Sequence, residues 1–274
     1  MRVLAVILLV GALAGCAGAE AMTLPPQPAA PTAGSAEAAH ELGLIPGESM
    51  AFAVHLGGVL GGEAQLAVGE IGELDGHRAI VVKSRAATAG VVKLLRNFVD
   101  EATTTIDAET GRPLLLDTSV TMNDKTTTAN AKFTGSAATV TYTKTDDPKP
   151  HTYHVDFGKV TVHDSHSAMA QMRGWRAAAG STMQVYVVGG RRMWRIDMTF
   201  VGNETVGSAL GNRKTVHLRG AAFRAKPNLQ IEAGNATRTF DVWISDDADR
   251  VPIKMTAHTE LGDVAMDLTE YNRP

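Results

Sequence analysis

Four of the nine histidines lie close together in the sequence, so metal binding is the first chemistry to consider. They are His151, His154, His163 and His166, with Asp156 and Asp164 nearby. On a strand, His151 and His154 point to opposite faces because their separation is odd. At a helix start, His163 and His166 share a face, and with Asp164 they offer nitrogen and oxygen ligands that suit zinc. Their spacing matches no known ligand pattern, so we predict no metal site and keep His163 and His166 as weak candidates. The alternative interpretation places these histidines on polar surface loops.

No other arrangement of residues points to a reaction. The chain has no Gly-x-Ser-x-Gly or Ser-x-x-Lys motif, and its glycine pairs match neither a phosphate loop nor a dinucleotide fingerprint. The acidic run Asp246, Asp247 and Asp249 ends too early for an EF-type calcium loop, so we expect these side chains to bond to their own turn. A carboxylate pair for glycoside hydrolysis stays open, because such residues are distant in sequence. The sequence predicts no cofactor and favours a non-catalytic protein, with a periplasmic enzyme acting on glycan or lipid as a third alternative.

The only cysteine, Cys16, follows a segment typical of a secretory signal peptide. Arg2 gives a positive start, and the apolar run over residues 3–10 is too short to span a bilayer as a helix. The four residues 13–16, LAGC, resemble the lipobox of bacterial lipoproteins, where the cysteine thiol is acylated and the peptide is cut before it. The resemblance implies a signal peptide over residues 1–15, lipidation at Cys16 and a membrane partner through that anchor. Ala17 stands where many lipoproteins of the inner membrane carry Asp, which favours the outer membrane, facing the periplasm.

Composition sets the domain organisation and excludes several classes of protein. Residues 16–40 are mostly Ala, Pro, Gly, Ser and Thr, which predicts a disordered tether with a reach of roughly 25 to 30 Å. Residues 41–274 are enough for a single large domain. The 26 basic and 29 acidic residues are interspersed, so nothing indicates a nucleic-acid partner. Aromatic residues make up 5% of the chain, too few for the girdles of a transmembrane β-barrel.

Period-two alternation of apolar residues dominates the rest of the chain. Met50, Phe52, Val54 and Leu56 fall on one face of a strand, and Trp194, Ile196, Met198 and Phe200 repeat the pattern. Turn sequences such as Asp75-Gly76 separate these runs at short intervals. Around a dozen short strands therefore predict a mainly β fold: a large, curled antiparallel sheet that closes into a barrel-like or sandwich domain.

About one helix is expected in addition to the strands. Residues 167–179 place Met169, Met172 and Trp175 three apart, and Gly180 stands where a left-handed C-terminal residue would end the helix. Residues 91–98 are ambiguous, since their apolar pattern suits both a helical turn and a buried strand.

Several short stretches of turn residues occur in order along the chain: LIPGE at 44–48, GEA at 62–64, IDAETGRPL at 106–114, VWISDD at 242–247, RVPI at 250–253 and the ending over 260–271. Taken in this order, they resemble a bacterial exported-protein family, domain of unknown function 3108. The resemblance covers residues 44–271 and implies a secreted or lipid-anchored, β-rich envelope protein without assigned catalytic residues. Where relatives commonly show Asp-Pro before the helix, this chain has HDSH at 163–166.

These observations favour a cell-envelope lipoprotein that binds a lipid or another apolar ligand in the periplasm, in the concave interior of the curled sheet. The alternative is a scaffold that holds another envelope protein by its outer face or by an exposed strand edge. Basic residues suggest contact with anionic lipid, although solvated charges on hairpins are the commoner explanation. These basic residues are Lys93, Arg96, Arg191, Arg192, Arg213 and Lys214.

Overall fold

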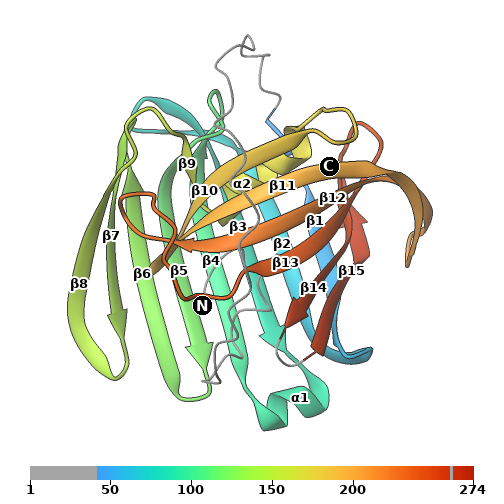
Figure 1. Cartoon of the computed structure of the whole chain (residues 1–274), viewed down its shortest axis with the longest axis horizontal. Helices are drawn as coiled ribbons and strands as arrows, with labels where there is room; N and C mark the ends of the chain where they lie inside the picture. Colours follow the sequence, from blue (N-terminus) through green and yellow to red (C-terminus); the bar gives the residue numbers. More distant parts are fainter. Residues whose placement is uncertain (1–41, 260–261) are drawn as a thin grey trace.

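The structure is a computed structural model that describes residues 42–259 and 262–274 (Figure 1). The predicted signal peptide, Cys16 and the tether lie outside the described residues. The elements are β1 (Ser49–Leu56), β2 (Val59–Leu74), β3 (His77–Thr88), α1 (Gly90–Leu95), β4 (Phe98–Asp107), β5 (Pro113–Met122), β6 (Lys125–Phe133), β7 (Ala137–Lys144), β8 (Asp147–Asp156), β9 (Val162–His163), α2 (Ser165–Gly174), β10 (Thr182–Gly189), β11 (Arg192–Ser208), β12 (Gly211–Ala225), β13 (Arg238–Ser245), β14 (Pro252–Thr259) and β15 (Gly262–Asn272).

All fifteen strands belong to one sheet, which confirms the predicted mainly β fold. Neighbours in the sheet are mostly neighbours in the sequence, and the pairing of β1 with β15 joins the first strand to the last. Every pair is antiparallel except β9 with β10. The sheet curls without closing, since β8 and β9 form its two edges. In Figure 1, β5 to β8 stand upright, with alternating directions, while β10 to β13 lie across the page.

Alternation explains why these residues form strands. Met50, Phe52 and Val54 are buried as predicted, while Leu56 is half-buried. The strands are longer than expected in places, since β2 has 16 residues and β11 has 17. The predicted hairpin at Asp75-Gly76 is confirmed, and both residues have positive φ (50° and 80°), as the tightest hairpin turn requires.

Two apolar clusters hold the curled sheet together. The larger one packs the inner faces of β1 to β4 and β10 to β15 against α2, with the helix contributing Met169 and Met172. The smaller one joins β5 to β8 with β9 to β12, and it includes Val155 and Val188. Neighbouring residues on β10 belong to different clusters, Val187 to the larger and Val188 to the smaller. The sheet is therefore buried on both faces at β10, next to the β9 edge. Side-chain packing between β5 to β8 and β9 to β12 closes the barrel, because the two edge strands are not joined by hydrogen bonds.

The main helix is where the sequence placed it, but its predicted ends were wrong. The side chain of Asp164 accepts hydrogen bonds from the backbone N–H groups of His166 and Ser167, so α2 begins two residues early. At the other end Arg250 donates to the carbonyls of Arg173 and Trp175 (3.1 and 3.0 Å), and Trp175 is extended. Gly180 therefore lies in a later turn. The ambiguous segment 91–98 contains both alternatives, since α1 ends at Leu95 and β4 begins at Phe98.

Candidate functional site

A chain of buried polar groups connects α2 to the inner face of β3 and β4. Thr104 on β4 donates a hydrogen bond to Asp164 Oδ2 and lies 2.7 Å from Nδ1 of His166. The other ring nitrogen of His166 lies 2.8 Å from Ser84 Oγ on β3. Thr104, Asp164 and His166 are at most 1% exposed, and Ser84 is 7% exposed. The arrangement fixes the rotation of α2 against the sheet.

The hydrogen-bond directions assign the protonation state of His166. Because the hydroxyl hydrogen of Thr104 points at Asp164, its oxygen accepts from Nδ1 of His166, which therefore carries the proton. Nε2 is then the acceptor for the Ser84 hydroxyl. Burial lowers the pKa of His166, and the charge of Asp164 opposes that change only in part. A neutral imidazole beside a serine is the arrangement that activates nucleophiles, but here Ser84 is buried within the core and the network is structural.

Replacing His166 by glutamine (H166Q) is expected to weaken the pH dependence of stability. The pKa of the folded protein lies below the unfolded value, so above about pH 6.5 both states are neutral at this residue. As pH falls below that value, only the unfolded state takes up the proton, and stability drops by at most about 1.4 kcal/mol per pH unit. Urea unfolding at pH 8 and pH 5.5 measures this loss. A wild-type loss equal to that of H166Q would contradict the assignment.

The structure separates the two weak metal candidates. His163 lies on β9 with Nδ1 3.2 Å from Ser167 Oγ. The ring of His166 instead contacts Thr104 and Ser84. Both are buried, so the interpretation of surface histidines is wrong for them. His151 and His154 lie on β8, where they contact Asp147 (2.6 Å) and Thr139 (3.0 Å). Within residues 42–259 and 262–274, no group of three or more His, Cys, Asp or Glu side chains is placed to hold a metal ion.

Sequence reasoning missed a buried ion pair at the C-terminal end of α2. Arg173 donates to both carboxylate oxygens of Glu48 (2.5 and 2.9 Å), and both side chains are fully buried. Arg173 also donates to the carbonyls of Asp249 and Arg250 (2.8 and 2.9 Å). Burial, with the charges of Glu48 and Asp249, raises the pKa of Tyr271, whose hydroxyl faces both carboxylates. Stretches that carry the family resemblance, around 48, 250 and 271, therefore meet at one place.

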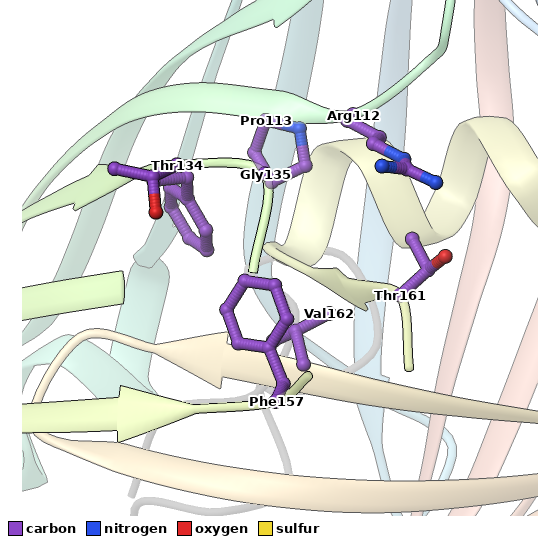
Figure 2. A pocket seen from close by; sticks show the side chains of 8 residues that line it. Arg112, Pro113, Thr134, Gly135, Phe157, Thr161 and Val162 are labelled. Carbon is purple, nitrogen blue, oxygen red and sulfur yellow. The ribbon is translucent and has the colours of Figure 1, made fainter. Parts of the chain in front are cut away.

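The pocket in Figure 2 is too small to enclose a lipid. It lies beside the smaller core cluster, and its volume is about 10 Å³, the space of roughly one water molecule. Its lining consists of Arg112, Pro113, Phe133, Thr134, Gly135, Phe157, Thr161 and Val162. The inner face of the sheet, where we expected a concave ligand site, is packed against α2. Any apolar binding would therefore take place at the surface.

Apolar side chains protrude at the end of the molecule where β1 turns into β2 and β3 is followed by α1. Their exposed fractions range from 56% to 86%, far above those of a core residue. The residues are Val59, Leu60, Val91, Leu94 and Leu95, which we call the apolar tip. Figure 1 shows α1 at the bottom of the molecule, with α2 nearer the opposite end. Exposed apolar groups gathered in this way make the tip a candidate interaction surface.

Hydrogen bonds to backbone carbonyls hold the apolar tip in place, although none of its side chains packs in the core. The N–H of Ala89 donates to the carbonyl of Gly61 (2.9 Å), which joins the start of α1 to β2. At the other end Thr88 Oγ1 donates to the carbonyl of Arg96 (3.0 Å). A six-residue helix without a side-chain cap and with no buried residue gains little from folding by itself. Leu94 and Leu95 are therefore exposed to solvent on a helix that is fixed at both ends.

The two edges of the sheet differ in how they are protected. β9 has only two residues, whereas β8 has ten and leaves one side of its backbone unpaired within the described sheet. Pro148 and Pro150 on β8 lack N–H groups, which discourages another strand from adding along the first half. Residues 151–156 have no such protection.

None of the helices among the described residues is long and apolar enough to cross a membrane. A crystal structure of a beta-barrel-like protein of domain of unknown function DUF1849 from Brucella abortus has a similar fold, with a TM-score of 0.56 at 12% identity. The match covers 83% of this chain and 98% of that chain. The hypothetical lipoprotein YmcC from Escherichia coli matches at a TM-score of 0.31 and 11% identity, over 84% of this chain and 86% of that one.

No curated protein matches this chain by sequence. The sequence model of one family, described as Protein of unknown function (DUF3108), matches residues 51–269. This match spans β1 to β15 and therefore nearly all of the described domain. The chain belongs to the family Protein of unknown function (DUF3108).

Proposed function

We propose that the protein is a non-catalytic cell-envelope lipoprotein whose domain binds lipid at its surface, with the apolar tip inserted into an anionic bilayer. The observation that carries the proposal is the exposure of the tip, above all of Leu94 and Leu95 (86% and 82%). Lipidation at Cys16 and a periplasmic location at the outer membrane belong to the same proposal. They rest on the sequence of residues 1–17.

The shape and composition of the tip favour a bilayer over a protein partner. The tip is aliphatic, whereas the energetic centres of protein interfaces are enriched in Trp, Tyr and Arg. Side chains as exposed as Leu94 and Leu95 protrude from the surface and enter a fluid lipid phase without a matching groove. Leucine and valine side chains inserted into the boundary between headgroups and acyl chains are a common means of peripheral binding.

Charge at the tip matches an anionic surface. Lys93 is exposed between Val91 and Leu94, and Arg96 follows the last turn of α1. Within the described part of the chain, neither cation forms an ion pair with an acidic side chain. A lysine or arginine near an anionic membrane surface contributes about 1 kcal/mol each. The two together predict binding about thirty-fold tighter to anionic than to neutral vesicles.

The tether is long enough for anchor and tip to reach one membrane. The described chain enters β1 at Ser49, and the tip lies at the other end of that strand, about 26 Å away for eight residues. Residues 17–41, if extended, span at most about 85 Å. A chain anchored at Cys16 can therefore place α1 against the same bilayer.

Vesicle flotation tests the proposal with residues 17–274, which contain every described element and lack the acylated cysteine. We expect co-flotation with vesicles that contain 30 mol% phosphatidylglycerol, about thirty-fold weaker binding to pure phosphatidylcholine, and a further decrease at 0.5 M salt. Equal binding to both vesicle types, or no binding to either, would contradict the proposal.

The unprotected half of β8 supports a second candidate, a scaffold that takes up a strand of another envelope protein. Residues 151–156 offer backbone groups on one side and carry no proline. Replacement of Thr152 by proline (T152P) would block such pairing without touching the apolar tip. Cross-linking in membranes from cells that carry wild type or T152P tests this candidate, which requires a cross-linked partner that T152P loses.

A further inference from the structure

Three arginines gather on one face of the sheet, several strands away from the apolar tip. Arg192 begins β11, and Arg224 on β12 lies directly opposite Trp194 of β11. Arg238 begins β13 opposite Ala222, and its guanidinium carbon lies 4.9 Å from the centre of the Trp194 ring. Residues two apart on a strand, or opposite on neighbouring antiparallel strands, share a face. Arg192, Arg224 and Arg238 therefore lie on the face that also carries Trp194.

Charges of the same sign lie close together in this cluster, since Arg191, Arg224 and Arg238 all act on the charge of Arg192. With Arg191 in the preceding turn there are four guanidinium groups, which we call the arginine cluster. Glu232 pairs with Arg224 (Nε to Oε2, 2.6 Å). Within residues 42–259 and 262–274, Arg191 and Arg192 make no side-chain hydrogen bond or ion pair. Burial, together with Arg191, Arg224 and Arg238, lowers the pKa of Arg192 to about 10.

We propose that the arginine cluster is a binding site for a phosphate group. Cations that repel one another in a half-buried place gain most from an anion that contacts several of them. Guanidinium groups match the oxygen geometry of phosphate with paired hydrogen bonds, and at this site Arg192 and Arg238 stand at the starts of β11 and β13. The packing of Arg238 on Trp194 limits its motion and prepares it for such a contact. The phosphate comes either from a lipid headgroup or from a small soluble molecule.

Isothermal titration of the full chain in a nonionic detergent tests this site. The probes are inorganic phosphate, pyrophosphate and short-chain phosphatidic acid below its micelle concentration. We expect binding that weakens at least ten-fold in R192Q and in R238Q and stays unchanged in R219Q. Arg219 is the matched control, because it is an exposed arginine on the same sheet that already pairs with Asp241 (3.0 Å).

Comparison of the probes identifies the source of the phosphate. If phosphatidic acid binds more than ten-fold tighter than inorganic phosphate, the headgroup is the ligand, whereas equal affinities indicate a soluble phosphate. No heat from any probe, or equal binding by wild type and R192Q, would overturn the proposal. R192Q removes a repelled charge, so its melting temperature should not fall, and a loss of binding then reflects the site. These titrations do not involve the apolar tip, and their failure leaves the vesicle experiment unaffected.

Discussion

Replacing Arg173 by methionine (R173M) is expected to destabilise the domain by about 4 kcal/mol, a large part of the stability of a typical domain. The substitution leaves the carboxylate of Glu48 buried without its cation, since both oxygens of Glu48 accept from Arg173. It also removes the donors of the carbonyls of Asp249 and Arg250. Urea unfolding at pH 7 measures the change in the free energy of unfolding.

A second substitution distinguishes the buried charge from lost packing. In the double variant E48Q/R173M neither member of this pair carries a buried charge, so the free energy of unfolding should be about 2 kcal/mol higher than in R173M. Arg85 provides the matched surface control, because its pair with Glu101 (3.4 Å) is about half-exposed on both sides. R85M should change stability by less than about 0.5 kcal/mol. An R173M loss as small as that of R85M would show that the ion pair is not needed.

Replacing both leucines of α1 by serine (L94S/L95S) is expected to weaken vesicle binding about one hundred-fold. Burial of one leucine side chain contributes about 1.5 to 3 kcal/mol, and insertion of both to an interfacial depth corresponds to about 3 kcal/mol. Neither side chain packs in the core, so the free energy of unfolding should stay within about 0.5 kcal/mol of wild type. Co-sedimentation with phosphatidylglycerol vesicles measures the affinity.

Val201 supplies the control for this experiment. It is an exposed apolar residue (42%) on β11 and not a member of the apolar tip. V201S should bind vesicles as wild type does. If V201S and L94S/L95S weaken binding equally, the attraction is a general property of the surface and the tip has no special part in it.

The sequence was most informative where one face of a strand is buried. Alternation at Trp194, Ile196 and Met198 follows directly from the pleat of a strand with one dry face, so fold class and turn positions were predictable. The start of α2 was readable from Asp164, a local capping residue that our prediction passed over. The end of α2 was not predictable, because it depends on Arg250, which is 77 residues from Arg173. Contacts that distant leave no local pattern.

The candidate site was less predictable than the fold. Leu94 and Leu95 fit a buried strand as well as a helical turn, and only the structure shows that both are exposed. His166 was noticed for its residue type, but its role depends on Ser84 and Thr104, 82 and 62 residues away. Arg192 was noticed as half of a basic pair, whereas its charged neighbours Arg224 and Arg238 come together only through strand pairing.

A fluorescent probe on the tip tests the central claim most directly. Residues 17–274 contain no cysteine, so L94C places a single environment-sensitive label on α1, and T128C places one on the outer face of β6 as a control. With phosphatidylglycerol vesicles, the label at 94 should shift its emission to the blue and be quenched by lipids with nitroxide groups in their acyl chains. The label at 128 should do neither. If the protein binds vesicles but the label at 94 emits at the same wavelength as in the free protein in water, insertion of the tip is contradicted.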